Sequence, residues 1–141
     1  MRTEPNRMTD ELATKVIGAA IEVHRHLGPG YLESVYEEAM GIEFAKTGIT
    51  FERQKEISVS YKGCELGKHR LDFLVGGMLV VDLKTVEELA GIHKAQVISY
   101  LKTTGFQLGL LINFNVPVLK SGIQRIVYSE QSPVMTSGVL S

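Results

Sequence analysis

The first third of the chain spaces its apolar positions as two amphipathic helices do. Apolar residues recur three or four positions apart over residues 10–26 and again over residues 32–46, which predicts two helices that each bury one face. Thr9 and Asp10 offer capping side chains at the start of the first helix. Pro29, with a glycine on either side, ends it, because these residues continue a helix only at a cost.

Beyond residue 50 the pattern changes to a period of two residues, which is typical of strands with one buried face. In the segment 51–63, Ile57, Val59 and Tyr61 alternate with polar residues. Helical spacing returns once, before a continuous apolar run that predicts a central strand covered on both faces. The elements expected after the first strand are strands at 65–75 and 78–84, a helix at 90–105, and strands at 106–114 and 123–129.

This order of elements (helix, helix, three strands, helix, two strands) predicts an α/β fold in which helices flank one sheet. The chain has 141 residues, which fits one domain, because domains typically contain ~100 to 200 residues. We expect that domain to span residues 1–128. The small and polar residues 129–141 predict a flexible C-terminal tail.

The net charge and the number of cysteines limit the classes of protein to which the chain can belong. The net charge is −1, so any surface that binds nucleic acid has to be local. Cys64 is the only cysteine, which excludes an internal disulfide, a cysteine-ligated zinc site and an iron–sulfur cluster. The first residues lack the apolar core of a signal peptide, and no stretch reaches the ~18 apolar residues of a membrane span. We therefore expect a cytoplasmic protein that does not enter membranes.

Charged residues interrupt the two apolar strands around Gly76-Gly77. Asp72 lies in the first of these strands, and Asp82 and Lys84 lie in the second. A hairpin loop of residues 76–78 gathers the apolar side chains on one face and sets the two aspartates opposite each other, whereas a two-residue loop mixes the faces. The pairs expected in this register are Val75 with Leu79, Leu74 with Val80, Phe73 with Val81, Asp72 with Asp82, and Leu71 with Leu83.

Two carboxylates in such a pair repel each other, and a nearby positive charge has to offset that repulsion. At a Cβ separation of ~5 Å they repel each other by about 3 kcal/mol at an effective dielectric constant of about 20. Lys84 offsets much of this repulsion, but desolvation of three ions still costs several kcal/mol for each ion that is well buried. A divalent cation between Asp72 and Asp82 would compensate more, because carboxylate oxygens are ligands that Mg²⁺ prefers.

The same residues resemble a known motif. Asp72, followed by Asp82-Leu83-Lys84, is similar to the bipartite motif of the PD-(D/E)XK nuclease superfamily. Gly30, Glu33 and Tyr36 resemble the G-x-x-E-x-x-Y signature after which a bacterial family in that superfamily is named. The resemblance extends over nearly the whole chain. Downstream, Gln96 and Tyr100 form a third motif. It resembles the Q-x-x-x-Y helix of the RecB-like and Cas4-like branch.

The resemblance implies a restriction-endonuclease-like core with a mixed sheet, and hydrolysis of phosphodiester bonds in nucleic acid, DNA rather than RNA. It implies that Asp72, Asp82, Glu33 and the carbonyl of Leu83 hold Mg²⁺ or Mn²⁺. Lys84 would orient the attacking water or stabilise the transition state.

On the third predicted helix, the resemblance makes Gln96 a partner for a phosphate, a ligand carboxylate or a water, and Tyr100 a contact to the DNA backbone. The two side chains project together because they are four positions apart on a helix. Four further residues flank the site and are candidate phosphate contacts, namely His69, Arg70, His93 and Lys94.

Each of these roles has a structural alternative. Asp72 and Asp82 also fit a charged patch at the end of a sheet, and Lys84 fits a salt bridge to either of them. Glu33 in a first helical turn favours the helix dipole in any protein, and Tyr100 is equally suited to core packing. The second hypothesis for the whole chain is a module that binds nucleic acid or protein without turnover. A homodimer is expected only by analogy.

Overall fold

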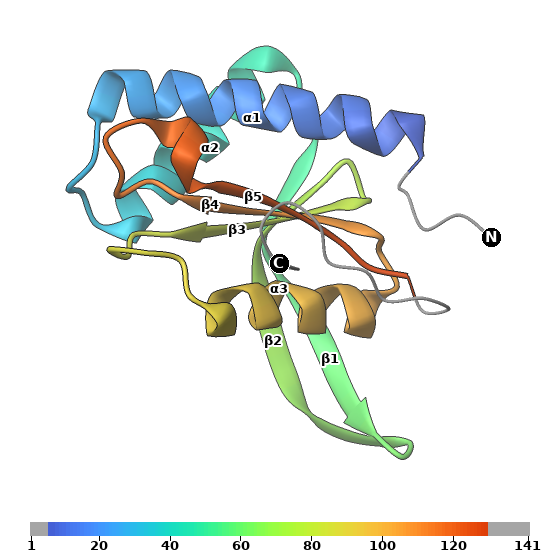
Figure 1. Cartoon of the computed structure of the whole chain (residues 1–141). Coiled ribbons are helices and arrows are strands. Elements are labelled where there is room, and N and C mark those ends of the chain that lie inside the picture. Colours follow the sequence, from blue (N-terminus) through green and yellow to red (C-terminus); the bar gives the residue numbers. More distant parts are fainter. Residues whose placement is uncertain (1–5, 130–141) are drawn as a thin grey trace.

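The computed structural model of the protein describes residues 6–129 (Figure 1). Within that range the chain forms three α-helices, one short 3-10 helix and five strands, in the order expected. These are α1 (Arg7–Leu27), α2 (Glu33–Thr47), β1 (Phe51–Tyr61), β2 (Cys64–Val75), β3 (Leu79–Lys84), α3 (Gly91–Thr104), β4 (Leu108–Asn113), η1 (Leu119–Gly122) and β5 (Ile123–Val127). The expected tail at 129–141 lies outside the described residues except for Ser129, which is buried.

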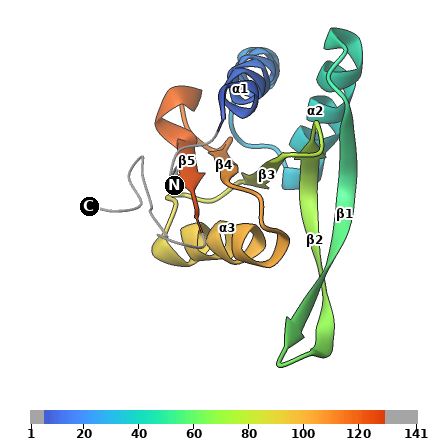
Figure 2. The same cartoon turned by 90° about the vertical axis from the view of Figure 1, so that its right-hand side faces the viewer.

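One five-stranded sheet forms the centre of the fold, with the strand order β1-β2-β3-β4-β5. Strands β3 and β4 are parallel, and the other neighbouring pairs are antiparallel, so the predicted mixed α/β sheet is confirmed. Helices α1 and α2 cover one face and α3 covers the other (Figure 2). Every residue of β4 is buried, as expected for a central strand. No helix among the described residues is long and apolar enough to cross a membrane.

Helix α1 begins earlier than the capping pattern predicted. Asn6 is the N-cap, and its side-chain oxygen accepts the backbone N–H of Thr9 at 2.9 Å. Thr9 is therefore a buried residue of the first turn, and the expected start at Asp10 is wrong. The physical reason is that asparagine satisfies the free amides of a helix start as well as threonine or aspartate does.

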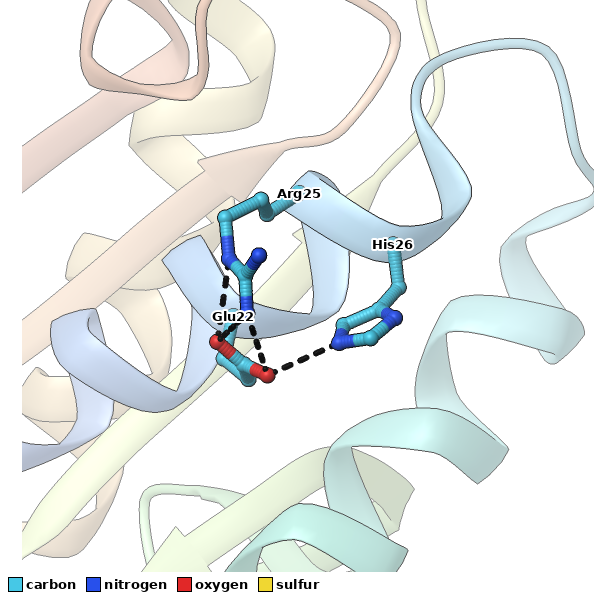
Figure 3. Close-up of polar contacts among 3 residues, drawn as sticks. All are labelled: Glu22, Arg25 and His26. Atoms are coloured by element: carbon cyan, nitrogen blue, oxygen red, sulfur yellow. Dashed lines mark hydrogen bonds and ion pairs between the residues drawn. The ribbon is translucent and has the colours of Figure 1, made fainter.

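The C-terminal turn of α1 carries a small ionic cluster (Figure 3). Arg25 and His26 both contact the Glu22 carboxylate, at 2.8 Å and 2.9 Å, and together they lower the pKa of Glu22. His24 turns inward instead, where its Nε2 lies 2.8 Å from the Val116 carbonyl oxygen. Both histidines thus have structural partners in this part of the chain.

The β2–β3 hairpin has the predicted register near its turn. Phe73 pairs with Val81, and the loop consists of three residues, 76–78, because this arrangement places the apolar side chains in the core. Gly76 and Gly77 have φ angles of 60° and 69°, a region that glycine adopts without the steric cost of a Cβ atom. The other two pairs of the ladder are Val75 with Leu79 and Leu74 with Val80.

Beyond Phe73 the prediction fails, because the ladder contains neither the Asp72–Asp82 pair nor the Leu71–Leu83 pair. Leu71 packs in the cluster beneath α3, whereas Leu83 packs in the cluster beneath α1 and α2. The reason is that β2 leaves β3 and follows β1 into a long two-stranded arm that projects past α3 (Figures 1 and 2). A gap therefore opens between β2 and β3 at the position of the two aspartates.

Candidate active site

The gap between β2 and β3 is bridged by the side chain of Asp72. Its Oδ2 accepts the backbone N–H of Leu83 at 2.7 Å. The next carbonyl along β3, that of Lys84, faces β4, where it accepts the N–H of Phe114 at 3.0 Å. Successive backbone groups of a strand point to opposite neighbours, so the carbonyl of Leu83 faces the gap and Asp72.

Asp82 is the most deeply buried acid in this region, with a side chain that is 8% exposed. Its Oδ2 atom is buried without a hydrogen-bond partner among the described residues, and the Nζ of Lys84 lies 3.6 Å away, too far for a hydrogen bond. Burial and a hydrogen bond with the Asp72 carboxyl raise the pKa of Asp82 to about 8, although Lys84 opposes the shift. Asp82 is therefore mainly protonated at pH 7 unless another positive charge joins it.

Glu33 is the first residue of α2, and it is half-buried. Burial raises the pKa of Glu33, the charge of Asp72 raises it further, and Lys84 lowers it. The charges of Asp72 and Lys84 thus act on the Glu33 carboxyl. The first-turn position also favours a carboxylate through the helix dipole, so the two readings of Glu33 are compatible.

Tyr100 approaches the site from α3. Burial raises the pKa of Tyr100, and the charges of Asp82 and Asp72 raise it further. Its ring also lies 6.0 Å from the ring of His69, at the base of the arm. Gln96, one turn earlier, is exposed, and its side chain forms no hydrogen bond with Asp72 or Asp82 in this part of the chain. The structure thus brings one member of the expected helix pair to the aspartates.

The candidate phosphate contacts are spread over two elements. Arg70 lies on β2 within 3.5 Å of Glu56, an ion pair across the arm. His93 accepts the N–H of Ala90 at 2.9 Å and so caps the start of α3, which is a structural role. Lys94 follows it on the same helix and is half-buried.

A polar network that the sequence did not reveal lies beside Asp72. Gln54 of β1 donates to the Oε1 of Glu37 at 2.9 Å, and the same amide nitrogen lies 3.5 Å from the Oδ1 of Asp72. The other oxygen of Glu37, a buried residue of α2, accepts from Arg53 at 2.6 Å. Gln54 has a φ angle of 55°, which is uncommon for a residue with a side chain and is often found at functional sites. A run of five polar residues, 52–56, at the start of a predicted strand is the only sequence signal of this network.

Two further side chains fix the backbone around the site. The side-chain amide of Asn113, a buried residue, exchanges two hydrogen bonds with the backbone of Val86, at 2.8 Å and 3.0 Å. This holds the segment that follows Lys84. The hydroxyl of Tyr36 donates to the Gly28 carbonyl and accepts the Tyr31 N–H, which holds the segment that precedes Glu33.

The donor atoms around the gap suit a hard divalent cation. They are the carboxylates of Asp72, Asp82 and Glu33 and the Leu83 carbonyl, all oxygen ligands. The unpartnered Oδ2 of Asp82 is the atom that a cation would satisfy. In residues 6–129, however, no three His, Cys, Asp or Glu side chains are already arranged as a metal-binding group. The residues fit the ion by their chemistry and would have to draw closer to bind it.

Comparisons with known proteins identify the superfamily of the chain. A family model described as the PD-(D/E)XK nuclease superfamily matches residues 10–126. No match was found among curated proteins. Among solved structures, an alkaline exonuclease from Laribacter hongkongensis is similar with a TM-score of 0.45 and 14% sequence identity, over 93% of this chain and 74% of the exonuclease. Because the family model covers most of its length, the chain belongs to the PD-(D/E)XK nuclease superfamily.

Proposed function

We propose that this protein is a metal-dependent nuclease that hydrolyses phosphodiester bonds in DNA. Membership of the superfamily supports nuclease activity in general, while the ion and the substrate are our proposals. The observation that carries the proposal is the meeting of Asp72, Asp82 and Lys84 at the gap between β2 and β3. A buried acid with an unpartnered oxygen beside a second carboxylate is costly, and binding of a cation explains it.

Members of this superfamily generally use divalent metal ions. In this chain, Asp72, Asp82, Glu33 and the Leu83 carbonyl would hold Mg²⁺ or Mn²⁺. A bound ion of this kind acidifies a water molecule and neutralises charge on the phosphate. Lys84 is mostly buried and holds its positive charge beside Asp82. Because little water reaches such a site, the charge of Lys84 would interact strongly with a phosphorane-like transition state.

We also propose that the chain belongs to the G-x-x-E-x-x-Y family and to the RecB/Cas4-like branch. In support, the charge of Asp72 acts on the Glu33 carboxyl, and Tyr36 anchors the loop that precedes Glu33. Tyr100 lies close enough to both aspartates to respond to their charge and would contact the DNA backbone. Gln96 is exposed on the same helix and would reach a phosphate, a ligand carboxylate or a water only once substrate or ion is bound.

Basic residues near the site would bind the phosphates of the substrate. Arg70 and His69 at the base of the arm, together with His93 and Lys94 at the start of α3, are our candidates. We further propose that residues 1–128 form one domain, that the protein works in the reducing cytoplasm, and that two copies act together to cut both strands of a duplex.

Metal titration of cleavage tests the proposal. Plasmid, linear duplex and single-stranded RNA would be incubated with the protein and increasing Mg²⁺ or Mn²⁺. The wild type is expected to cut DNA only with the ion, and Asp82→Ala and Lys84→Ala are expected to be inactive. Lys46→Ala, which changes an exposed residue near the end of α2, is the matched control and should retain full activity. Equal cleavage by all four proteins would contradict the assignment of Asp82 and Lys84 to a nuclease site.

A binding module without turnover is the second candidate. The observation in its favour is that the described residues contain no metal-binding group that is already assembled. Calorimetry separates the two functions, because a nuclease site should bind Mn²⁺ in a manner that Asp82→Ala abolishes. A module of the second kind should bind DNA equally well with and without the ion.

A further inference from the structure

Two large apolar side chains are exposed immediately before Glu33. Tyr31 is 49% exposed and Leu32 is 74% exposed. Single exposed apolar residues are common on protein surfaces, but this pair directly precedes a proposed ligand of the metal ion. The position makes these two side chains candidates for contact with the substrate.

The segment that carries Tyr31 is held rigidly. The Tyr36 hydroxyl accepts the Tyr31 N–H at 3.2 Å and donates to the carbonyl of Gly28. Gly28 and Gly30 have φ angles of 70° and 106°, which residues with a Cβ atom rarely adopt. The ring of Tyr31 is therefore presented at little further cost in conformational entropy, and such preorganisation favours binding.

A row of aromatic rings connects Tyr31 to the backbone of β3. The Tyr31 ring meets the ring of Tyr36 edge-on, with 6.1 Å between the centroids. Tyr36 in turn stacks on Phe114 at 4.5 Å, and the N–H of Phe114 donates to the Lys84 carbonyl. Tyr31 is thus the solvent-exposed end of a packed row whose other end is the backbone of a proposed catalytic residue.

We propose that Tyr31, together with Leu32, packs against an unpaired base next to the bond that is cut, so that the preferred substrate is single-stranded DNA or a frayed duplex end. This inference rests on the proposed nuclease function. In a duplex the faces of the bases are covered by their neighbours, whereas an unpaired base offers a face to an aromatic side chain. The chain has a net charge of −1, so attraction to the phosphate backbone depends on a few local basic residues, and stacking on Tyr31 would add to it.

Binding and cleavage of two oligomers of equal length test the proposal, one an oligothymidylate and the other an abasic deoxyribose phosphate oligomer. For the oligothymidylate, Tyr31→Ala should raise Kd and KM by roughly 5- to 150-fold, the range of base stacking on an aromatic ring, with little change in kcat. The same substitution should have no effect with the abasic oligomer. Leu32→Ala should act in the same direction with a smaller effect, and Tyr31→Phe should behave as the wild type.

Tyr61→Ala is the matched control, because Tyr61 is 60% exposed and lies at the far end of the arm, where it should leave the affinity for the oligothymidylate unchanged. The hydrogen bond between Tyr36 and Tyr31 uses the backbone of Tyr31, so Tyr31→Ala should leave the Tm nearly unchanged. An equal loss with both oligomers, or an equal loss in Tyr61→Ala, would overturn the proposal. So would a change of oligomeric state in Tyr31→Ala, which would mark the pair as a protein contact.

Failure of the nuclease function can be told apart from failure of this inference. If the wild type cuts neither oligomer with any divalent ion, the proposed catalysis is wrong. Fluorescence anisotropy still reports binding of each oligomer in that case. A base-dependent loss of affinity in Tyr31→Ala would then support stacking, and no loss would reject it.

Discussion

Asp72 accepts a hydrogen bond from the backbone amide of Leu83 across the gap between β2 and β3. Where the two strands separate, the aspartate side chain takes the place of a backbone acceptor. The contact fixes the Asp72 carboxylate relative to β3 and keeps it close to Asp82. The divergence of two strands, rather than their pairing, thus creates the acidic site.

Asp72→Asn should separate the structural role of this side chain from its charge. Asparagine retains an oxygen for the Leu83 amide, so the stability of the metal-free protein should be nearly unchanged. Loss of one ionic ligand should reduce DNA cleavage at least ~100-fold, because the ion contributes several kcal/mol to catalysis. Urea unfolding and a cleavage assay measure the two effects.

Asp72→Ala is the matched comparison, because it removes both the charge and the acceptor. We expect it to be less stable than Asp72→Asn by about 1–3 kcal/mol, the cost of a buried amide that is left without a partner. Equal stabilities of the two variants would show that the contact with Leu83 contributes nothing to folding.

The stability of the metal-free protein should fall as the pH rises. Asp82 has a pKa of about 8 in the folded state against an ordinary value of 3.8, so the folded state binds more protons than the unfolded chain between these values. The free energy of unfolding therefore decreases with increasing pH across this window and levels off above it. Urea unfolding with a chelator at pH 5 and pH 8 measures the difference.

Asp82→Asn provides the control for this titration. The variant cannot ionise at this position, so its stability should depend less on pH and should exceed that of the wild type at pH 8. Addition of Mn²⁺ at pH 8 should stabilise the wild type but not the variant, because an ion bound to the folded state alone shifts the unfolding equilibrium. A wild type that is equally stable at pH 5 and pH 8 contradicts the prediction.

Much of the fold could be predicted from the sequence because burial alone determines it. The spacing of apolar residues predicts the order of the helices and strands. The need to bury Phe73 and Val81 on one face predicts the register of the β2–β3 hairpin near its turn. The same register predicts a pair of Asp72 with Asp82, whereas the two residues lie where β2 and β3 separate.

The remaining parts depend on tertiary contacts that no local pattern contains. The separation of β2 from β3 requires knowing that β1 and β2 continue as an arm, which moves Leu71 to the other core cluster. The backbone conformation of Gln54 and its contact with Glu37 join residues from a strand and a helix. Neither residue belongs to the motifs that point to the site.

Gln54 should position Asp72 for metal binding. Partners that lie behind the ligands of a metal ion typically change its affinity by 10–100-fold, so Gln54→Leu should weaken Mn²⁺ binding by roughly 10-fold. Gln54→Gly should weaken the binding equally but with less loss of stability than Gln54→Leu, because glycine adopts a φ angle of 55° without strain. Calorimetry with Mn²⁺ and urea unfolding measure the two quantities.

Ser58→Ala is the control for Gln54, because Ser58 is an exposed residue of the same strand. It should change neither the metal affinity nor the stability. If Gln54→Leu and Gln54→Gly bind Mn²⁺ as the wild type does, the network beside Asp72 serves folding alone.

Tyr36→Phe should loosen the loop before Glu33 while the aromatic row remains. The substitution leaves the Gly28 carbonyl and the Tyr31 amide without their partner, which should cost about 1–3 kcal/mol of stability. Stacking of Tyr36 on Phe114 needs only the ring, so the core should stay packed. Because the loop becomes mobile, the affinity for single-stranded DNA should fall, but by a smaller factor than in Tyr31→Ala.

Tyr128→Phe is the control for this last substitution, since no hydrogen bond to the Tyr128 hydroxyl is present within residues 6–129, and its stability and affinity should match the wild type. In a double variant, Tyr36→Phe should add little to the loss of affinity caused by Tyr31→Ala, because both act through the same ring. Fully additive losses of affinity would mean that Tyr36 acts on the substrate by a separate route, and the loop would then have no part in presenting Tyr31.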